Sequence, residues 1–191
     1  MPPARCYVLE VPERRDAAAS PTIRLWVQVV TPAGTPSDAL PLVWLTGGPG
    51  DAASAVVGHV VAGVGTRRPL VFVDQRGTGQ SLPRLDCQEA DQLFIDPTLP
   101  WAQRVGQART VAAACRDHLV AAGVDLAAYD TSDDVQDIVD LRRALGYAQW
   151  EVYGVSYGGR LAQQLLARDE AGVAAVILDS SITSEPVSYT L

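Results

Sequence analysis

The chain has 191 residues, of which 48% are hydrophobic and 19% charged, and its formal net charge at pH 7 is −7. This length allows one domain with a substantial core, and the composition is that of a globular protein. The negative charge disfavours non-specific binding to nucleic acid or to anionic membranes, because both are themselves negative. All fifteen basic residues are arginine, which excludes chemistry that depends on a lysine amine.

Six segments predict β-strands. The first two are rich in β-branched residues, as strands usually are. The next two are short, continuous apolar runs bounded by turn residues, a pattern typical of strands buried on both faces of a parallel sheet. Two more strands are expected in the last quarter of the chain. The six segments are Cys6–Val11, Thr22–Thr31, Leu42–Leu45, Leu70–Val73, Trp150–Val155 and Val173–Leu178.

Three segments predict helices between these strands. The first is Ala102–Ala122 and the last begins around Leu161. The middle helix has Thr131 as its expected N-cap, with Asp134 three residues later as the capping-box partner. Apolar residues then recur at i, i+3 and i+4 until Gly146, which is typical of one face packed on a core. Strands alternating with helices predict an α/β fold, a doubly wound and mostly parallel sheet with one or two antiparallel strands at its start.

A Gly-x-Ser-x-Gly motif runs from Gly154 to Gly158, between a predicted strand and a predicted helix. In this setting the motif is the nucleophile elbow of α/β-hydrolases. The turn is so tight that side chains at the two glycines would collide. It holds the Oγ of Ser156 clear of the sheet and aims the backbone N–H of Tyr157 at the reacting oxygen. Ser156 is therefore the expected nucleophile.

A second glycine-rich motif, Thr46–Gly50, directly follows the strand at 42–45. Acyl transfer produces an oxyanion that needs two backbone donors, one after the serine and one from the loop after an early strand. Pro49 has no N–H, so Gly48 is the expected donor, with Gly50 as the second choice. A plain turn is the alternative interpretation, and the elbow further along the chain favours the oxyanion loop.

The third motif, Asp74–Ser81, follows the strand at 70–73 and reads Asp-Gln-Arg-Gly-Thr-Gly-Gln-Ser. Its two glycines permit a sharp turn, and we expect Asp74 and Arg76 to pair and to lock that turn beside the oxyanion loop. A phosphate-binding loop is disfavoured, because no Gly-Lys-Ser/Thr is present.

These motifs together resemble the prolyl/tripeptidyl aminopeptidase family of α/β-hydrolases, and the tripeptidyl branch is the more similar because its members carry cysteines near the positions of Cys87 and Cys115. The resemblance spans nearly all of residues 1–191. It implies an α/β-hydrolase fold without cofactor or metal, and the removal of short N-terminal pieces from peptides. It also implies Ser156 as nucleophile with Gly48 and Tyr157 as oxyanion donors. Two further matching stretches are Leu145-Gly146-Tyr147 and Val176-Ile177-Leu178-Asp179-Ser180.

A serine nucleophile also needs a base and an orienting acid, which in this fold follow the serine along the chain. No histidine follows Ser156, and we expect His59 and His118 to face solvent or to be structural. Asp179, at the end of the last predicted strand, is expected to be structural. Asp169 is expected at the exposed end of the elbow helix.

In the family, a helical cap and the strands that carry the acid and the histidine come after this point. The chain therefore resembles the N-terminal part of a single α/β-hydrolase domain, truncated after the strand that follows the elbow. The expected partners are a peptide or a small ester or amide substrate, and a complementary C-terminal half or a second copy. Two alternatives stay open: an esterase or thioesterase, and a non-catalytic module that binds a partner through an exposed sheet edge.

The three cysteines leave two interpretations. Cys87 and Cys115 could form a bridge that closes a loop of about 28 residues, worth about 3.5 kcal/mol from chain entropy, with Cys6 left over. Alternatively, each is a buried free thiol. The N-terminus lacks the apolar core of a secretory signal, which predicts a cytoplasmic chain, with secretion still open if an upstream signal has been removed.

Overall fold

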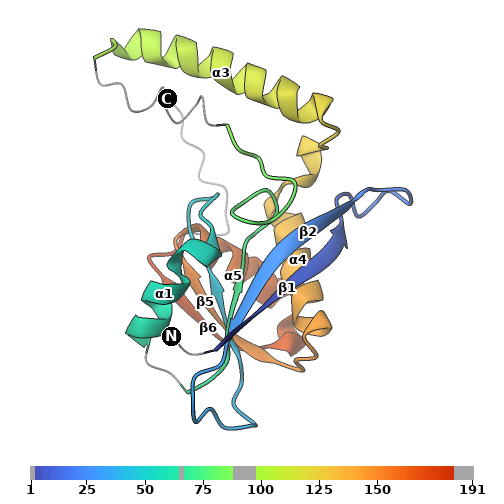
Figure 1. Ribbon diagram of the computed structural model, residues 1–191, viewed down its shortest axis with the longest axis vertical. Helices are drawn as coiled ribbons and strands as arrows, with labels where there is room; N and C mark the ends of the chain where they lie inside the picture. The colour runs from blue at the N-terminus through green and yellow to red at the C-terminus, as the bar shows by residue number, and fades with distance from the viewer. Residues whose placement is uncertain (1–2, 65–66, 88–97, 183–191) are drawn as a thin grey trace.

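A six-stranded sheet forms the centre of the molecule in the computed structural model, which describes residues 3–64, 67–87 and 98–182 (Figure 1). The strand order is β1-β2-β4-β3-β5-β6. The pairs β1–β2 and β2–β4 are antiparallel, and the other neighbours are parallel. The strands are β1 (Ala4–Pro12), β2 (Thr22–Val30), β3 (Leu42–Leu45), β4 (Leu70–Val73), β5 (Trp150–Val155) and β6 (Val173–Asp179). This confirms the predicted mixed sheet with two antiparallel strands at its start.

Helices cover both faces of the sheet. α1 packs on one face over a small apolar cluster that includes Phe72. α4 and α5 pack on the other face over the main core, which includes Trp150. The helices are α1 (Ala53–Val64), α3 (Trp101–Ala121), α4 (Thr131–Ala144) and α5 (Tyr157–Arg168), with short 3₁₀ turns η1 (Leu126–Ala128) and η2 (Glu170–Gly172). The sheet is thus doubly wound, as predicted.

The central strands are buried and the last strand is not. All four residues of β4 are buried, because β4 lies between two other strands and beneath α1. β6 lies at the edge of the sheet, where Ile177 and Leu178 are each 48% exposed. Neighbouring residues of a strand point to opposite faces, so both faces of the sheet carry exposed apolar surface at this edge.

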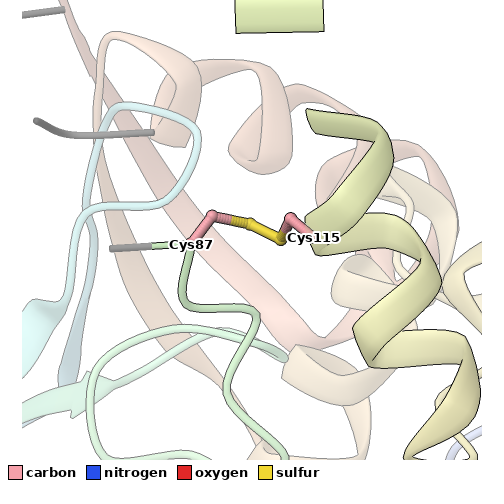
Figure 2. Close-up of a disulfide and its surroundings, with 2 residues drawn as sticks. All are labelled: Cys87 and Cys115. Carbon is pink, nitrogen blue, oxygen red and sulfur yellow. A yellow bond between two sulfur atoms is a disulfide. The ribbon is translucent and has the colours of Figure 1, made fainter. Parts of the chain in front are cut away.

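Helix α3 lies apart from the sheet and is joined to the rest by a disulfide (Figure 1). Figure 2 shows the bond between Cys87, in the segment that leads away from β4, and Cys115 on α3. Leu119 is the buried residue of α3. Of the two interpretations of these cysteines, the structure has the bridge. Cys6 is a free thiol as expected, but it is exposed on the edge strand β1 rather than buried.

The sequence prediction missed or misplaced two helix features. Helix α1 was not predicted, because its valines and glycines are poor helix formers. The N-cap of α4 is Asp130 rather than Thr131, and its carboxylate accepts a hydrogen bond from the backbone N–H of Asp133 at 2.9 Å. Asp134 is therefore not a capping-box partner, and it turns inward and is buried.

Among the residues that the structure describes, no helix has the length and the apolar character needed to cross a membrane.

Candidate active site

Ser156 occupies a strained turn between β5 and α5. Its φ is 53° and its ψ is −115°, a left-handed conformation that residues other than glycine rarely adopt. Three backbone hydrogen bonds hold the turn. The N–H of Ser156 donates to the carbonyl of Asp179 at 2.9 Å, and its carbonyl accepts from Gly159 at 3.0 Å and from Ile182 at 3.1 Å. The turn is therefore fixed both by its own helix and by the segment at the end of β6.

The glycines on either side of Ser156 allow this close approach. A Cβ atom at Gly154 would lie 2.5 Å from the carbonyl oxygen of Gly158. A Cβ atom at Gly158 would lie 2.1 Å from the carbonyl oxygen of Leu45, at the end of β3. Neither position has room for a side chain, so α5 can begin against β3 and β5 only with glycine at both.

The glycine-rich loop after β3 lies directly beside Ser156. A Cβ atom built at Gly47 would be 3.1 Å from the Cβ and 3.7 Å from the Oγ of Ser156. The next residue, Gly48, has a φ of +102° and its own Cβ position would clash with the backbone of Gly50. The Thr46 hydroxyl donates to the carbonyl of Asp51 at 2.9 Å and closes the loop. The structure thus brings the loop of Gly48 and the elbow together.

The loop after β4 also lies at this edge of the sheet, but the hydrogen bonds that hold it differ from the predicted ones. The carboxylate of Asp74 accepts hydrogen bonds from the backbone and the hydroxyl of Ser54 on α1, at 2.8 and 2.7 Å, and from the backbone of Gln80 at 2.9 Å. Gly79 is required here, because a Cβ atom would lie 2.2 Å from Asp74 Oδ2. Asp74 therefore fastens its own loop to α1.

Arg76 does not pair with Asp74, which corrects the prediction. Its guanidinium binds both carboxylate oxygens of Asp137 on α4 at 2.8 Å, and it also donates to the carbonyls of Glu13 and Ala128. The side chains of Arg76 and Asp137 are 1% and 4% exposed. The oxygens of Asp74 are already used, and Arg76 points to the opposite face of the sheet, so it joins the loop to α4 instead.

The residue after the nucleophile reaches towards the same helix. The Tyr157 side chain is buried, and its hydroxyl lies 2.9 Å from the hydroxyl of Thr131 in the first turn of α4. Burial is the main reason why the pKa of Tyr157 is raised, and the nearby charge of Asp134 adds to the effect. Tyr157 thus connects the elbow to the start of α4.

Asp134 is a buried carboxyl group next to this connection. The residue is 8% exposed, and among the described residues its Oδ1 has no hydrogen-bond partner. Burial, reinforced by the charge of Asp137, raises the pKa of Asp134 to about 7, although the charge of Arg76 acts in the opposite direction. A hydrogen bond from the Arg76 backbone also lowers the pKa of Asp134, while the Arg76 guanidinium forms its ion pairs with Asp137 and Asp133.

Among the described residues, the two histidines and the side chains of Asp169 and Asp179 form no hydrogen bond to the Ser156 hydroxyl. His59 on α1 and His118 on α3 are both exposed. Asp179 accepts a hydrogen bond from the Tyr153 hydroxyl at 2.9 Å. Asp169, expected at an exposed helix end, is instead buried, because both of its oxygens bind the guanidinium of Arg142 at 2.8 and 3.0 Å. In the part of the chain that the structure describes, no group of three or more His, Cys, Asp or Glu residues is placed to hold a metal ion.

Four residues of this region were not singled out as functional from the sequence. Gly47 could have been identified as the glycine that precedes the proposed donor. Asp137 lies on the buried stripe of α4, where a charged residue indicates a buried partner. The burial of Asp134, and the hydrogen bond from the Ser156 N–H to the Asp179 carbonyl, depend on contacts between distant segments and left no signal in the sequence.

The chain belongs to the α/β-hydrolase fold family, whose family model matches residues 41–190. No curated protein gave a significant sequence match. Similar solved structures include proline iminopeptidase from Mycobacterium smegmatis, with 24% identity, a TM-score of 0.57 and coverage of 92% of this chain and 44% of that chain. A proline iminopeptidase-related protein from Thermus thermophilus has 21% identity, a TM-score of 0.55 and coverages of 93% and 45%.

A third similar structure is 2-hydroxy-6-oxo-6-phenylhexa-2,4-dienoate hydrolase from a Rhodococcus species, with 17% identity, a TM-score of 0.54 and coverages of 94% and 48%. The chain therefore spans less than half the length of each of these three proteins. At these identities the likeness shows the fold alone. It confirms the predicted α/β-hydrolase fold, and the named activities differ from one structure to another.

Proposed function

We propose that this chain supplies the nucleophile and the oxyanion hole of a serine hydrolase that removes short N-terminal pieces from peptides. The observation that carries the proposal is the left-handed turn at Ser156, whose Oγ lies beside Gly47 of the loop after β3. A strained residue of this kind costs about 1–3 kcal/mol and is concentrated at functional sites.

In the proposed reaction, the Ser156 Oγ attacks the carbonyl carbon of the substrate while its proton passes to a general base. The carbonyl oxygen becomes an oxyanion, which the backbone N–H groups of Gly48 and Tyr157 stabilise. The bond between the carbonyl carbon and the amide nitrogen then breaks, and the base delivers the proton to the leaving amine. Water hydrolyses the resulting ester of Ser156 and restores the hydroxyl.

The general base and its acid come, in this proposal, from a segment outside this sequence. His59 and His118 are exposed, and the structure gives neither of them a hydrogen bond to Ser156. The edge strand β6 supports such an arrangement, because Ile177 and Leu178 expose apolar surface there that a complementary segment would cover. The chain alone is expected to have weak or no turnover.

The choice of a peptide substrate rests on the motif resemblance and on two of the similar structures, which are a proline iminopeptidase and a related protein. An ester or thioester substrate would use the same nucleophile and the same oxyanion hole. Hydrolysis rates for amino-acid and tripeptide anilides, measured beside those for simple p-nitrophenyl esters, separate these substrate classes.

Labelling of Ser156 by a fluorophosphonate, with and without added imidazole, tests the nucleophile directly. Imidazole can replace a missing histidine base, so we expect slow labelling of the isolated chain and a severalfold increase with imidazole. The label should map to Ser156 by mass spectrometry, disappear in Ser156→Ala and persist in the matched control Ser181→Ala. Rapid stoichiometric labelling without imidazole would contradict the external base, and no labelling under either condition would contradict the nucleophile.

A non-catalytic binding module is the second candidate, and the exposed edge at β6 is the observation that favours it. This candidate predicts that a partner binds equally well to the wild type and to Ser156→Ala, and that neither protein is labelled with or without the partner. The serine hydrolase instead predicts labelling of the wild type once the partner is bound.

A further inference from the structure

A short segment, residues 179–182, lies against the turn that carries Ser156, and we call this segment the brace. Its first residue, Asp179, accepts a hydrogen bond from the Ser156 N–H at 2.9 Å, and its last residue, Ile182, donates one to the Ser156 carbonyl at 3.1 Å. Between them, Ser180 has a φ of 50°. Of the residues that the structure describes, Ser156 and Ser180 are the two that have a positive φ without being glycine. Two strained turns are therefore joined by hydrogen bonds.

One end of the brace is anchored by β5. The Asp179 carboxylate accepts a hydrogen bond from the Tyr153 hydroxyl and another from the Ser180 hydroxyl, each at 2.9 Å. The Tyr153 ring stacks on Trp44 of β3, with the ring centroids 4.4 Å apart, so it is fixed on the sheet. Asp179 is therefore held by its side chain while its carbonyl accepts the hydrogen bond from Ser156.

The other end of the brace is anchored by α5. The Gln163 side-chain amide donates to the Ile182 carbonyl at 2.9 Å. The same nitrogen lies 3.2 Å from Ser181 Oγ and 3.0 Å from the Gly159 carbonyl oxygen, so its two hydrogens are shared among three acceptors. The brace passes so close to α5 that a Cβ atom at Gly159 would lie 2.6 Å from the Cβ of Ser181. Ile182 is thus held through its N–H by Ser156 and through its carbonyl by Gln163.

We propose that Gln163, and Asp179 together with Tyr153, are positioning residues for the nucleophile, which keep Ser156 in its strained conformation by holding the brace against it. A strained backbone conformation persists only where the surrounding contacts fix it. The backbone hydrogen bonds alone would let the turn and the brace relax together, whereas the side chains tie the brace to β5 and α5. The consequence for catalysis rests on the proposed function, since it requires Ser156 to be the nucleophile. The effect on the conformation of Ser156 does not require it.

Amide hydrogen exchange, measured by NMR on the whole chain, tests whether these side chains hold the brace. The reporters are the N–H groups of Ser156 and Ile182, which are the two donors between the turn and the brace. Gln163→Leu removes the amide but keeps a side chain of similar size. In this variant both reporters should exchange roughly tenfold faster, as expected for the loss of about one hydrogen bond. Tyr153→Phe, which keeps the stacked ring, should have the same effect.

Two comparisons separate this local effect from a general loss of stability. Rates are taken relative to the amides of Val43 and Val71, which are fully buried in the central strands, so that a change in global stability cancels. The matched controls are Gln164→Leu, at a position about 100° around α5, and Tyr147→Phe, in the loop between α4 and β5, and neither should change the relative rates. A test variant that leaves both relative rates unchanged overturns the role of the residue that it replaces, and so does equal acceleration in its control.

The rate of imidazole-assisted labelling of Ser156 addresses catalysis separately. In Gln163→Leu the maximum labelling rate should fall severalfold while the half-saturating fluorophosphonate concentration stays the same, because the placement of the nucleophile changes and the binding of the reagent does not. An unchanged maximum rate, together with accelerated exchange, would overturn the catalytic consequence. If Gln163→Leu accelerates exchange at Ser156 but the wild type is never labelled, the role of the brace stands and the proposed function fails.

Discussion

Replacing Asp134 by asparagine should stabilise the protein at high pH and have little effect at low pH. The carboxyl group has a pKa of about 7 in the fold and an ordinary value of 3.8. Between these values the unfolded chain has released the proton while the folded chain still holds it, so the stability of the wild type falls as the pH rises through this window. The full difference corresponds to about 4 kcal/mol, and it is complete above pH 7.

Urea unfolding of the wild type and of Asp134→Asn at pH 4.5, 6 and 8 measures this contribution. Asparagine has the same shape but cannot ionise, so the free energy of unfolding of the variant should gain on that of the wild type by about 3–4 kcal/mol between pH 4.5 and pH 8. Comparison of the two proteins cancels the other titrating groups. If the difference in the free energy of unfolding between the two proteins stays constant from pH 4.5 to pH 8, the pKa of Asp134 is not raised by burial and the reasoning is refuted. The variant Asp140→Asn should show no such gain.

Three further predictions concern the frame around the site. Asp169→Ala leaves the Arg142 guanidinium buried and unpaired, and should lower the free energy of unfolding by about 3–5 kcal/mol in a urea titration. Gly158→Ala places a Cβ atom against a backbone carbonyl of β3 and should lower the free energy of unfolding by at least about 2 kcal/mol in the same assay, as overpacking does. In the control Gly106→Ala on α3, the new Cβ atom has open space, so the change should be neutral or slightly stabilising. Cys115→Ser removes the tether of α3, so limited trypsin digestion should cleave α3 before the sheet domain, and stability should fall by about 3.5 kcal/mol; equal digestion of both proteins would contradict the tether.

The sequence predicted the sheet well because local pattern determines most of it. Leu42–Leu45 and Leu70–Val73 are continuous apolar runs, and the structure has strands with these bounds. The strand at Trp150–Val155 was likewise placed correctly, next to the Gly-x-Ser-x-Gly motif. Helix α1 was missed because its valines and glycines favour other conformations, and it forms through packing on the sheet rather than through local preference.

The contacts of the candidate site were harder to predict than its backbone. The elbow and the loop of Gly48 follow from short motifs, and the structure brings them together. The partner of Arg76 is 61 residues away along the chain, and nothing local to Arg76 indicates that Asp137 rather than Asp74 receives it. The spacing of Asp134 from Thr131 resembled that of a capping box. Successive helix residues are about 100° apart around the axis, so neighbouring positions in the first turn differ in whether they face solvent or the core.

The hydrogen bonds that fix Ser156 have a consequence for the rigidity of the site. Two of the three backbone bonds at this turn come from Asp179, the last residue of the edge strand β6, and from Ile182 just beyond it. Edge segments open more readily than the centre of a sheet, and opening here would release the strained turn towards a relaxed conformation. A segment that pairs with β6 would therefore hold Ser156 in its strained conformation without contacting it. Binding at the sheet edge and the conformation of the nucleophile would then change together.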